Sequence, residues 1–485
     1  MRKEKSMLFN SFHFYVFIVL VLGLYWSIPK KWQWVLLLAS SYFFYMSWEP
    51  RYAVLIFLTT LVSYLCALAI DRYRQQRTLF LALGAAVNLG VLFVFKYFNF
   101  FFNSLQNFTQ YFEIGMPVPT LSLLLPVGIS FYTFQTVSYV VDVYRGTQKP
   151  EKHFGYFALF VSFFPQLVAG PIERAENLLP QLKAPHWFDR EQVVSGIKLF
   201  ALGLFKKVVI ADNLAVVVDT VFTSLPEYKG LSLILAILLF SWQIYCDFSG
   251  YTDMARGVAR ILGVNLVENF NHPYTATSIT DFWRRWHMSL SRWFRDYLYI
   301  PLGGNRQGLS RTALNLFIVF ALCGLWHGAA WTFVLWGALH GVVMAIERIG
   351  MHVWSRKFQI PAVVSMAYTY GVVLASWVLF RAQNLADAAY IYRYALSGAK
   401  NFWRPDYIWA TLNQVFGTNQ LEMAIVLACL AMISAWEFGA LDFGIRRWPR
   451  VWGQPVVRWT FYSVAVVLIF LLGQTEIQEF IYFQF

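Results

Sequence analysis

Charged residues are scarce in this chain. Only 13% of its 485 residues are charged and 58% are hydrophobic, whereas a soluble globular protein has about 25% charged residues. The mean hydropathy is +0.50. This balance excludes an ordinary water-soluble fold and predicts an integral membrane protein.

Cysteine is also rare, and the signatures of several enzyme classes are missing. The four cysteines lie in apolar runs without CxxC or metal-ligand spacing, at Cys66, Cys246, Cys323 and Cys429. We expect them to be packing residues. No GxSxG, GDS, Walker A or HExxH motif occurs, so the serine-hydrolase, phosphate-loop and zincin classes have no support. We expect no metal cofactor.

Basic residues outnumber acidic ones and give a formal net charge of +13. In a membrane protein, Lys and Arg gather in cytoplasmic loops and at anionic lipid headgroups. The charge therefore predicts membrane lipid as a partner and no nucleic acid. The loops after the first, third and fifth apolar runs are the richest in base, which predicts that the N-terminus lies outside the cytoplasm.

Long apolar runs make up most of the chain. A spanning helix needs about 20 apolar residues, and we predict about 11–13 hydrophobic segments, with candidate spans at 8–28, 33–48, 51–70, 79–98, 121–143, 196–222, 231–250, 313–334, 335–349, 363–380, 421–441 and 457–473. The shorter run 154–169 is interpreted as re-entrant. The first run has no small-residue cleavage site, so we interpret it as a transmembrane helix rather than a signal peptide.

No linker or soluble segment interrupts these runs. The sequence therefore predicts an all-α polytopic membrane protein with a single domain over residues 1–485. Its 19% aromatic content exceeds what lipid-facing helices need, so we expect some aromatic side chains to line an internal path.

Two polar islands interrupt the apolar pattern in the middle of the chain. The first, 163–182, contains "FFPQLVAGPIER", in which Pro and Gly break the helix. It is either broken backbone surrounded by protein or a cavity, or a surface loop. The second, 242–274, holds Asp247 and Asp253 near the end of an apolar run. Arg256 is spaced to pair with Asp253, while Asp247 is open to an interfacial or a functional interpretation.

The third island is "FWRRWHMSLSRWFRDYLYIPLGG", residues 282–304. On a helix, one face carries aromatic and apolar side chains and the adjoining face carries polar ones; the first set is Trp283, Trp286, Leu290 and Phe294, and the second is Arg284, His287, Ser291 and Arg295. Arg285 and Arg292 extend the basic side. This pattern is typical of a helix in the membrane interface, with the arginines as headgroup anchors. His287 lies between the two faces and is placed to point inward.

A second histidine, His327, lies in the apolar run "CGLWHGAAW". Ionisable residues at membrane depth are functional candidates, and burial keeps an imidazole neutral and able to act as a general base. Gly324 and Gly328 flank His327 and permit close approach of another backbone or a substrate. We interpret His340, thirteen residues later, as structural.

Several motifs together resemble the membrane-bound O-acyltransferase family, in particular its bacterial branch that acts in alginate O-acetylation and in D-alanylation of teichoic acids. The motifs are the third island, "GLWHG", "LLPVGISFYTFQTVSYVVDVYRG", "FPQLVAGPIER", "DFSGYTDMARG" and the terminal "FIYFQF". They occur in order over nearly the whole chain. The resemblance implies helices around a central tunnel or funnel, with added interfacial and re-entrant helices.

The resemblance also implies roles for individual residues. The family's catalytic histidine falls on His327, and its second polar position falls on His287. His327 would take the proton of an acceptor hydroxyl, and His287, Trp326 or a backbone N–H would stabilise the oxyanion. Further substrate or cofactor contacts are expected from Trp283, Arg284, Arg285, Ser291, Arg295 and Asp247, with the arginines facing phosphates of coenzyme A or of an acyl carrier.

The reaction implied is transfer of an acetyl group from acetyl-CoA to an extracytoplasmic polysaccharide. Since the chain has no GDS motif, we expect the acetyl group to pass to a separate extracytoplasmic transferase of the SGNH type or to other polysaccharide-modification proteins. The expected location is the bacterial cytoplasmic (inner) membrane. Two alternatives are D-alanyl transfer from a carrier protein and a transporter without acyl-transfer activity, which broken helices and intramembrane polar groups would equally fit.

Overall fold

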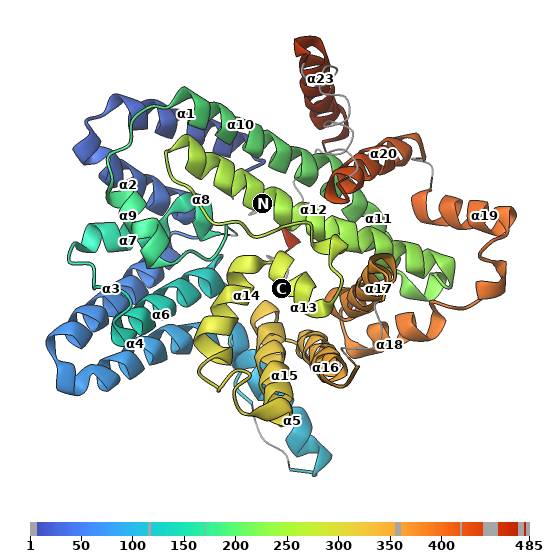
Figure 1. Cartoon of the computed structure of the whole chain (residues 1–485), viewed down its shortest axis with the longest axis horizontal. Helices are drawn as coiled ribbons and strands as arrows, with labels where there is room; N and C mark the ends of the chain where they lie inside the picture. Colours follow the sequence, from blue (N-terminus) through green and yellow to red (C-terminus); the bar gives the residue numbers. More distant parts are fainter. Residues whose placement is uncertain are drawn as a thin grey trace. The chain divides into compact units, whose positions relative to one another are not determined.

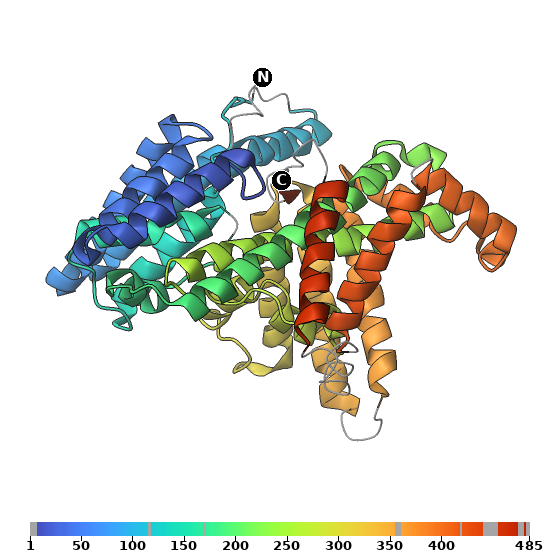
Figure 2. The ribbon, with the colours of Figure 1, turned by 90° about the horizontal axis from the view of Figure 1, so that it is seen from above.

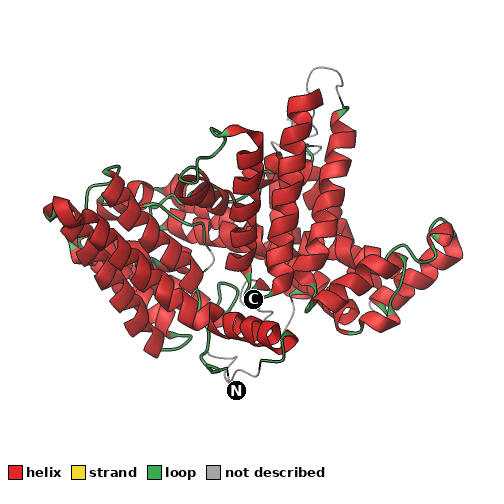
Figure 3. Ribbon diagram, turned by 90° about the horizontal axis from the view of Figure 1, so that it is seen from below, coloured by secondary structure: helices red, strands yellow, loops and turns green. Residues whose placement is uncertain are grey.

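The structure is a computed structural model, and it describes residues 7–114, 118–168, 170–354, 360–417, 420–439, 454–473 and 480–481. Within these ranges the regular structure is helical and no strand occurs (Figure 3). The all-α prediction is therefore confirmed. Contacts between residues group the chain into two compact units, Met1–Phe200 with Thr252–Val267 and Ala201–Tyr251 with Glu268–Phe485.

The first unit contains the helices of the N-terminal part of the chain (Figure 1), namely α1 (Phe12–Ser27), α2 (Gln33–Met46), α3 (Arg51–Arg72), α4 (Arg77–Leu92), α5 (Phe98–Tyr111), α6 (Ile129–Arg145), α7 (Phe154–Ser162), α8 (Phe164–Leu167) and α9 (Ala175–Lys183). Two helices contribute residues to both units, α10 (Arg190–Phe205) and α12 (Leu231–Ile261).

The second unit contains the helices that carry the two histidines and the C-terminal part of the chain (Figure 2), namely α11 (Asp212–Thr223), α13 (Ile279–Arg285), α14 (Met288–Phe294), α15 (Gly308–His327), α16 (Trp331–Trp354), α17 (Ala362–Arg381), α18 (Leu385–Tyr394), α19 (Pro405–Phe416), α20 (Gln420–Glu437) and α23 (Pro455–Leu472).

Among the described residues, eight helices are long and apolar enough to cross a membrane. They confirm a multi-pass membrane protein, although the expected 11–13 segments include shorter helices such as α1 and α2. Two boundaries differ from the prediction for identifiable reasons. The span predicted from residue 121 begins at Ile129, because Gly128 has a left-handed backbone. The two spans predicted at 313–334 and 335–349 are divided earlier than expected. The first of the two helices ends at His327, where the Gly328 backbone is extended.

The first polar island is broken backbone surrounded by protein, as one of its two interpretations predicted. Helices α7 and α8 are separated at Phe163. Phe163, Gln166 and Glu173 are 0%, 3% and 0% exposed, which rules out a surface loop. Glu173 accepts a hydrogen bond from the Val267 N–H at 2.6 Å, so a buried carboxylate ties this segment to the residues after α12.

Two further predictions are confirmed. The four cysteines are free and buried, as expected for packing residues. Arg256 lies 3.7 Å from Asp253 in an i,i+3 ion pair.

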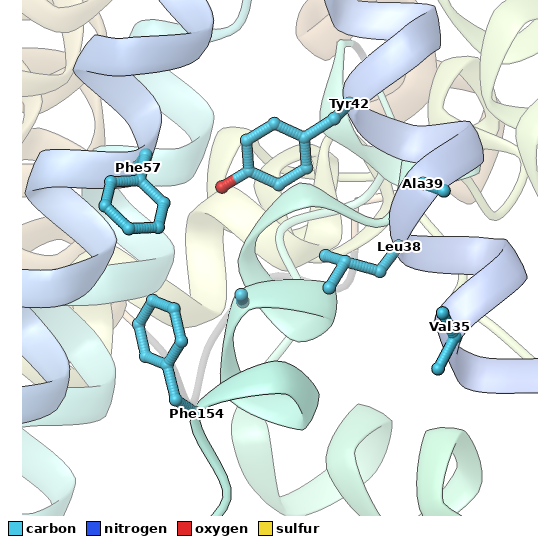
Figure 4. Close-up of a pocket in the computed structure, with 7 residues that line it drawn as sticks. Val35, Leu38, Ala39, Tyr42, Phe57 and Phe154 are labelled. Carbon is cyan, nitrogen blue, oxygen red and sulfur yellow. The ribbon is translucent and has the colours of Figure 1, made fainter. Parts of the chain in front are cut away.

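An apolar pocket lies on the first unit between α2, α3 and α7 (Figure 4), lined by Val35, Leu38, Ala39, Tyr42, Phe57, Phe154 and Ala158. The Tyr42 hydroxyl is the one polar group among these side chains. Apart from this hydroxyl, the lining side chains offer no acid, base or nucleophile.

Among the described helices of the second unit, α15 and α16 share the most extensive contact, and they run side by side (Figure 1). Glycines make this contact possible. A Cβ atom on Gly337 would lie 2.0 Å from the Phe320 carbonyl oxygen, and one on Gly324 would lie 2.1 Å from the Phe333 carbonyl oxygen. Such small residues let membrane helices pack backbone to backbone.

We expect Gly337→Ala to destabilise the protein, because the new methyl group meets a carbonyl oxygen that cannot move independently of its helix. Overpacking of this kind costs about 1–3 kcal/mol. Gly371→Ala in α17 is the matched control, since its Cβ meets nothing within 4 Å. Thermal unfolding in detergent should show a lower midpoint for Gly337→Ala alone; equal midpoints for both variants would contradict the tight contact.

Candidate active site

The segment that carries His287 is two short helices rather than one. The continuous amphipathic helix predicted over this island is wrong, because α13 ends at Arg285 and α14 begins at Met288. Between them His287 has a left-handed backbone, with φ 44 and ψ 53. A non-glycine residue in this region is uncommon and is often found at functional sites. The break turns the His287 side chain into the protein, where it is 0% exposed.

Helix α13 is held at its start by a carboxylate from α16. The Glu347 Oε1 and Oε2 atoms accept hydrogen bonds from the backbone N–H groups of Ile279 and Thr280, at 2.9 and 3.4 Å. The Ser278 hydroxyl accepts the next one, from Asp281, at 3.0 Å. The first N–H groups of a helix have no partner within the helix and favour a negative charge. Glu347 therefore fixes α13 to α16.

His327 ends α15 and is 3% exposed. Three aromatic rings surround it: the centroid distances are 4.9 Å to Trp326, 5.0 Å to Trp336 and 5.5 Å to Phe380. The structure brings the two predicted catalytic histidines together, with ring centroids 6.3 Å apart. They come from helices that are forty residues apart in sequence, so this pairing depends on the fold.

His287 is enclosed by the same kind of surface. Its ring lies edge-on to Phe248 at 4.7 Å and 6.0 Å from Trp326. Burial lowers the pKa of His287 from 6.5 to about 3, because an imidazolium would lose its hydration there. The imidazole is therefore neutral at physiological pH, with one nitrogen able to donate a hydrogen bond and the other able to accept one.

His340 packs against Trp336, whose ring also contacts that of His327. Its Nδ1 accepts a hydrogen bond from the Trp283 indole N–H at 3.3 Å, and its ring lies 5.1 Å from Trp336, the same tryptophan that contacts His327. The contact with Trp283 joins α16 to α13 and agrees with a structural role for His340. The spacing of Trp336 and His340, four residues apart on one helix face, was the signal in the sequence for this arrangement.

The arginines of the third island are exposed or half-buried. Arg284 and Arg295 are exposed. Arg285 pairs with Asp281 at 2.9 Å, and Arg295 pairs with Asp296 at 2.6 Å. Ser291 donates a long hydrogen bond of 3.4 Å to the Trp286 carbonyl. Contacts of these residues with a donor phosphate stay predictions.

Asp247 belongs to a buried ionic cluster that the sequence analysis did not foresee. The Lys207 Nζ atom lies 2.6 Å from Asp247 and 2.8 Å from Asp212, and all three side chains are about 4% exposed. The second oxygen of Asp247 accepts a hydrogen bond from the Ile481 backbone N–H at 2.8 Å. One lysine thus pairs with two carboxylates, and Asp247 also accepts a hydrogen bond from the end of the described chain. A lysine and an aspartate within the apolar run 196–222 were the available signal.

We expect Lys207→Met to destabilise the protein strongly, because it leaves two carboxylates buried without their cation. Removing one partner of a buried ion pair costs about 3–5 kcal/mol. Arg404→Met is the matched control, since Arg404 pairs with Asp406 on the surface. Thermal unfolding should separate the two variants. An unchanged midpoint for Lys207→Met would show that the cluster contributes no stability.

The residues 152–391 match the family model of the membrane-bound O-acyltransferases. The chain is 38% identical to the probable alginate O-acetylase AlgI of Pseudomonas putida over 501 residues, which cover 99% of this chain and 100% of that protein. It is 39% identical to the peptidoglycan O-acetyltransferase of Helicobacter pylori, over 74% of this chain and 72% of that protein.

A teichoic acid D-alanyltransferase of Bacillus subtilis is more distant, at 30% identity over 50% of this chain and 63% of that protein. The matched region 152–391 includes both buried histidines and the helices that hold them. With its eight candidate spans, the chain belongs to the membrane-bound O-acyltransferase family and is a multi-pass membrane O-acyltransferase.

Proposed function

We propose that this protein takes an acetyl group from cytoplasmic acetyl-CoA and passes it across the membrane for O-acetylation of an extracytoplasmic polysaccharide. The observation that carries the proposal is the pair of buried histidines, 6.3 Å apart within aromatic walls. The relatives named as O-acetylating enzymes support acetyl as the acyl group, because they match more of the chain and at higher identity than the D-alanyltransferase.

In the proposed reaction, His327 accepts the proton of an acceptor hydroxyl while the hydroxyl oxygen attacks the thioester carbonyl. A C–O bond forms, the C–S bond breaks, and the proton passes from His327 to the leaving thiolate. Neither imidazole is consumed. Because His287 is neutral, its N–H can donate to the oxyanion without a prior protonation step, and the Trp326 indole N–H is the other candidate donor.

In the proposed reaction, the aromatic side chains around the two histidines exclude water. Trp326, Trp336 and Phe380 surround His327, and Phe248 covers one edge of His287. Excluding water protects a thioester from hydrolysis and strengthens the hydrogen bonds to the developing charge. An acceptor hydroxyl would then meet the thioester before water does.

The donor and the partner follow from the same proposal. The exposed Arg284 and Arg295 are suited to the phosphates of coenzyme A. The acetyl group would pass to a separate extracytoplasmic transferase of the SGNH type, with the protein in the bacterial inner membrane. No metal takes part in the proposed steps. D-alanyl transfer from a carrier protein would use the same two histidines and differs in the donor.

We expect His327→Ala to abolish acetyl transfer, because the proposed step uses the His327 imidazole to take the hydroxyl proton. Membranes that contain the protein, incubated with radiolabelled acetyl-CoA, should lose label transfer by about 100-fold or more. His13→Ala is the control, since His13 is exposed on α1. Retained transfer in His327→Ala would refute the proposal. Transfer only from a D-alanyl carrier would assign the other donor, and substrate flux without thioester cleavage would indicate a transporter.

The neutrality of His287 has a measurable effect on stability. Between pH 6.5 and about 3, His287 binds a proton in the unfolded chain and not in the folded one. Its contribution therefore lowers the free energy of unfolding as the pH falls, by up to about 1.4 kcal/mol per pH unit. We expect His287→Asn to show a smaller loss of thermal stability than the wild type between pH 7 and pH 5. Parallel curves for the two proteins would contradict burial of a neutral imidazole.

A further inference from the structure

The left-handed turn at His287 needs external support. A non-glycine residue adopts this conformation at a cost in free energy and keeps it only where the surrounding structure fixes it. The turn joins α13 to α14, and each of these helices has only seven residues. Helices this short do not fix a turn by themselves.

The segment 269–271 contacts the chain on both sides of His287. Before the turn, the Asn271 N–H donates to the Arg285 carbonyl at 2.9 Å. After it, the Met288 N–H donates to the Asn269 carbonyl at 3.0 Å, and the Ser289 N–H donates to the Asn269 side-chain Oδ1 at 3.1 Å. Met288 and Ser289 are the first two residues of α14, whose N–H groups have no partner within the helix.

Asn269 thus serves as a cap for a helix to which it is not adjacent in sequence. Its side chain is 1% exposed, so no water competes for the Ser289 N–H. The Nδ2 group of Asn269 has no hydrogen-bond partner in the part of the chain that the structure describes. The amide therefore takes part in hydrogen bonding through its oxygen. An aspartate at this position would also offer an acceptor oxygen.

We propose that Asn269 is a positioning residue for acyl transfer, which orients the His287 imidazole toward His327 by holding the backbone at the start of α14. The proposal rests on the proposed function of the two histidines. Without Oδ1, the Ser289 N–H loses this hydrogen bond and the turn at His287 can relax. A displacement of about 1 Å at a reacting group can reduce the rate by about 100-fold.

Three variants test the proposal in membranes supplied with radiolabelled acetyl-CoA, with the rate normalised to the amount of folded protein. We expect Asn269→Ala to lower kcat by about 10-fold to 100-fold with little change in KM for acetyl-CoA. Asn269→Asp keeps the acceptor oxygen at a helix start, where a carboxylate is favoured, and should restore most of kcat. A purely structural role would not distinguish kcat from KM or respond to this rescue.

Asn88 provides the matched control. It is 0% exposed in the first unit and bonds to Ser63, Gly84 and Thr136, so Asn88→Ala also removes a buried amide. We expect it to lower thermal stability while kcat per folded molecule stays near the wild-type value. An equal loss of kcat in Asn88→Ala and Asn269→Ala would overturn the proposal, as would wild-type kcat in Asn269→Ala or no rescue by Asn269→Asp.

If Asn269→Ala yields no folded protein, Asn269→Gln replaces it, because glutamine keeps the amide and displaces its oxygen by one methylene group. The same loss of kcat is expected. The His327→Ala variant, measured in the same membranes, separates the two proposals. Retained transfer in that variant refutes the catalytic assignment, whereas loss of transfer there with unaltered kcat in the Asn269 variants refutes the positioning role alone.

Discussion

The backbone contact between α15 and α16 is the constraint on which the rest of the site depends. Gly324 and Gly337 allow carbonyl oxygens of the facing helix to approach within a distance that no side chain would tolerate. Helix α15 carries His327, and α16 carries Trp336, whose ring packs against that of His327. The same α16 binds α13 through Glu347. A single close-packed helix pair thus sets the positions of both histidines, one directly and the other through α13.

Several charged side chains of the second unit lie in ion pairs. Lys207 pairs with Asp212 and Asp247, and Arg285 pairs with Asp281. Aromatic rings cover both histidines, with Phe248 on His287 and with Trp326 and Trp336 on His327. In a medium of low dielectric constant, an unbalanced charge nearby would shift the protonation of an imidazole by several pKa units. Burial keeps the His287 imidazole neutral and leaves one of its nitrogens with a lone pair.

Much of this organisation could be predicted from local patterns. The apolar runs located spanning helices. His287, between an aromatic and a basic face, and His327, within an apolar run, stand out as functional candidates. The break at His287 could not be predicted, because histidine is not a residue that usually marks a turn and the helical periodicity continues through it. What imposes the break includes contacts from residues 269–271, about twenty positions upstream.

The ionic cluster was missed for a related reason. Asp247 was recognised as unusual, but its partner Lys207 lies on a different segment, and hydropathy alone does not pair charges that are distant in sequence. Likewise, no local pattern links His340 to Trp283, whose indole N–H donates to its Nδ1. Local periodicity predicts which face a residue occupies, whereas these roles depend on which helix that face meets.

The backbone at His287 also restricts how this position can vary. Left-handed φ and ψ values are accessible to glycine, and among the other residues mainly to asparagine, aspartate and histidine. Of these, only histidine and asparagine offer a neutral N–H donor near pH 7. The turn therefore limits substitution at this position. Few residues preserve the backbone conformation, and fewer still also preserve a neutral N–H donor. In this way the geometry of the main chain, as well as the chemistry of the reaction, limits which side chains natural variation can place opposite His327.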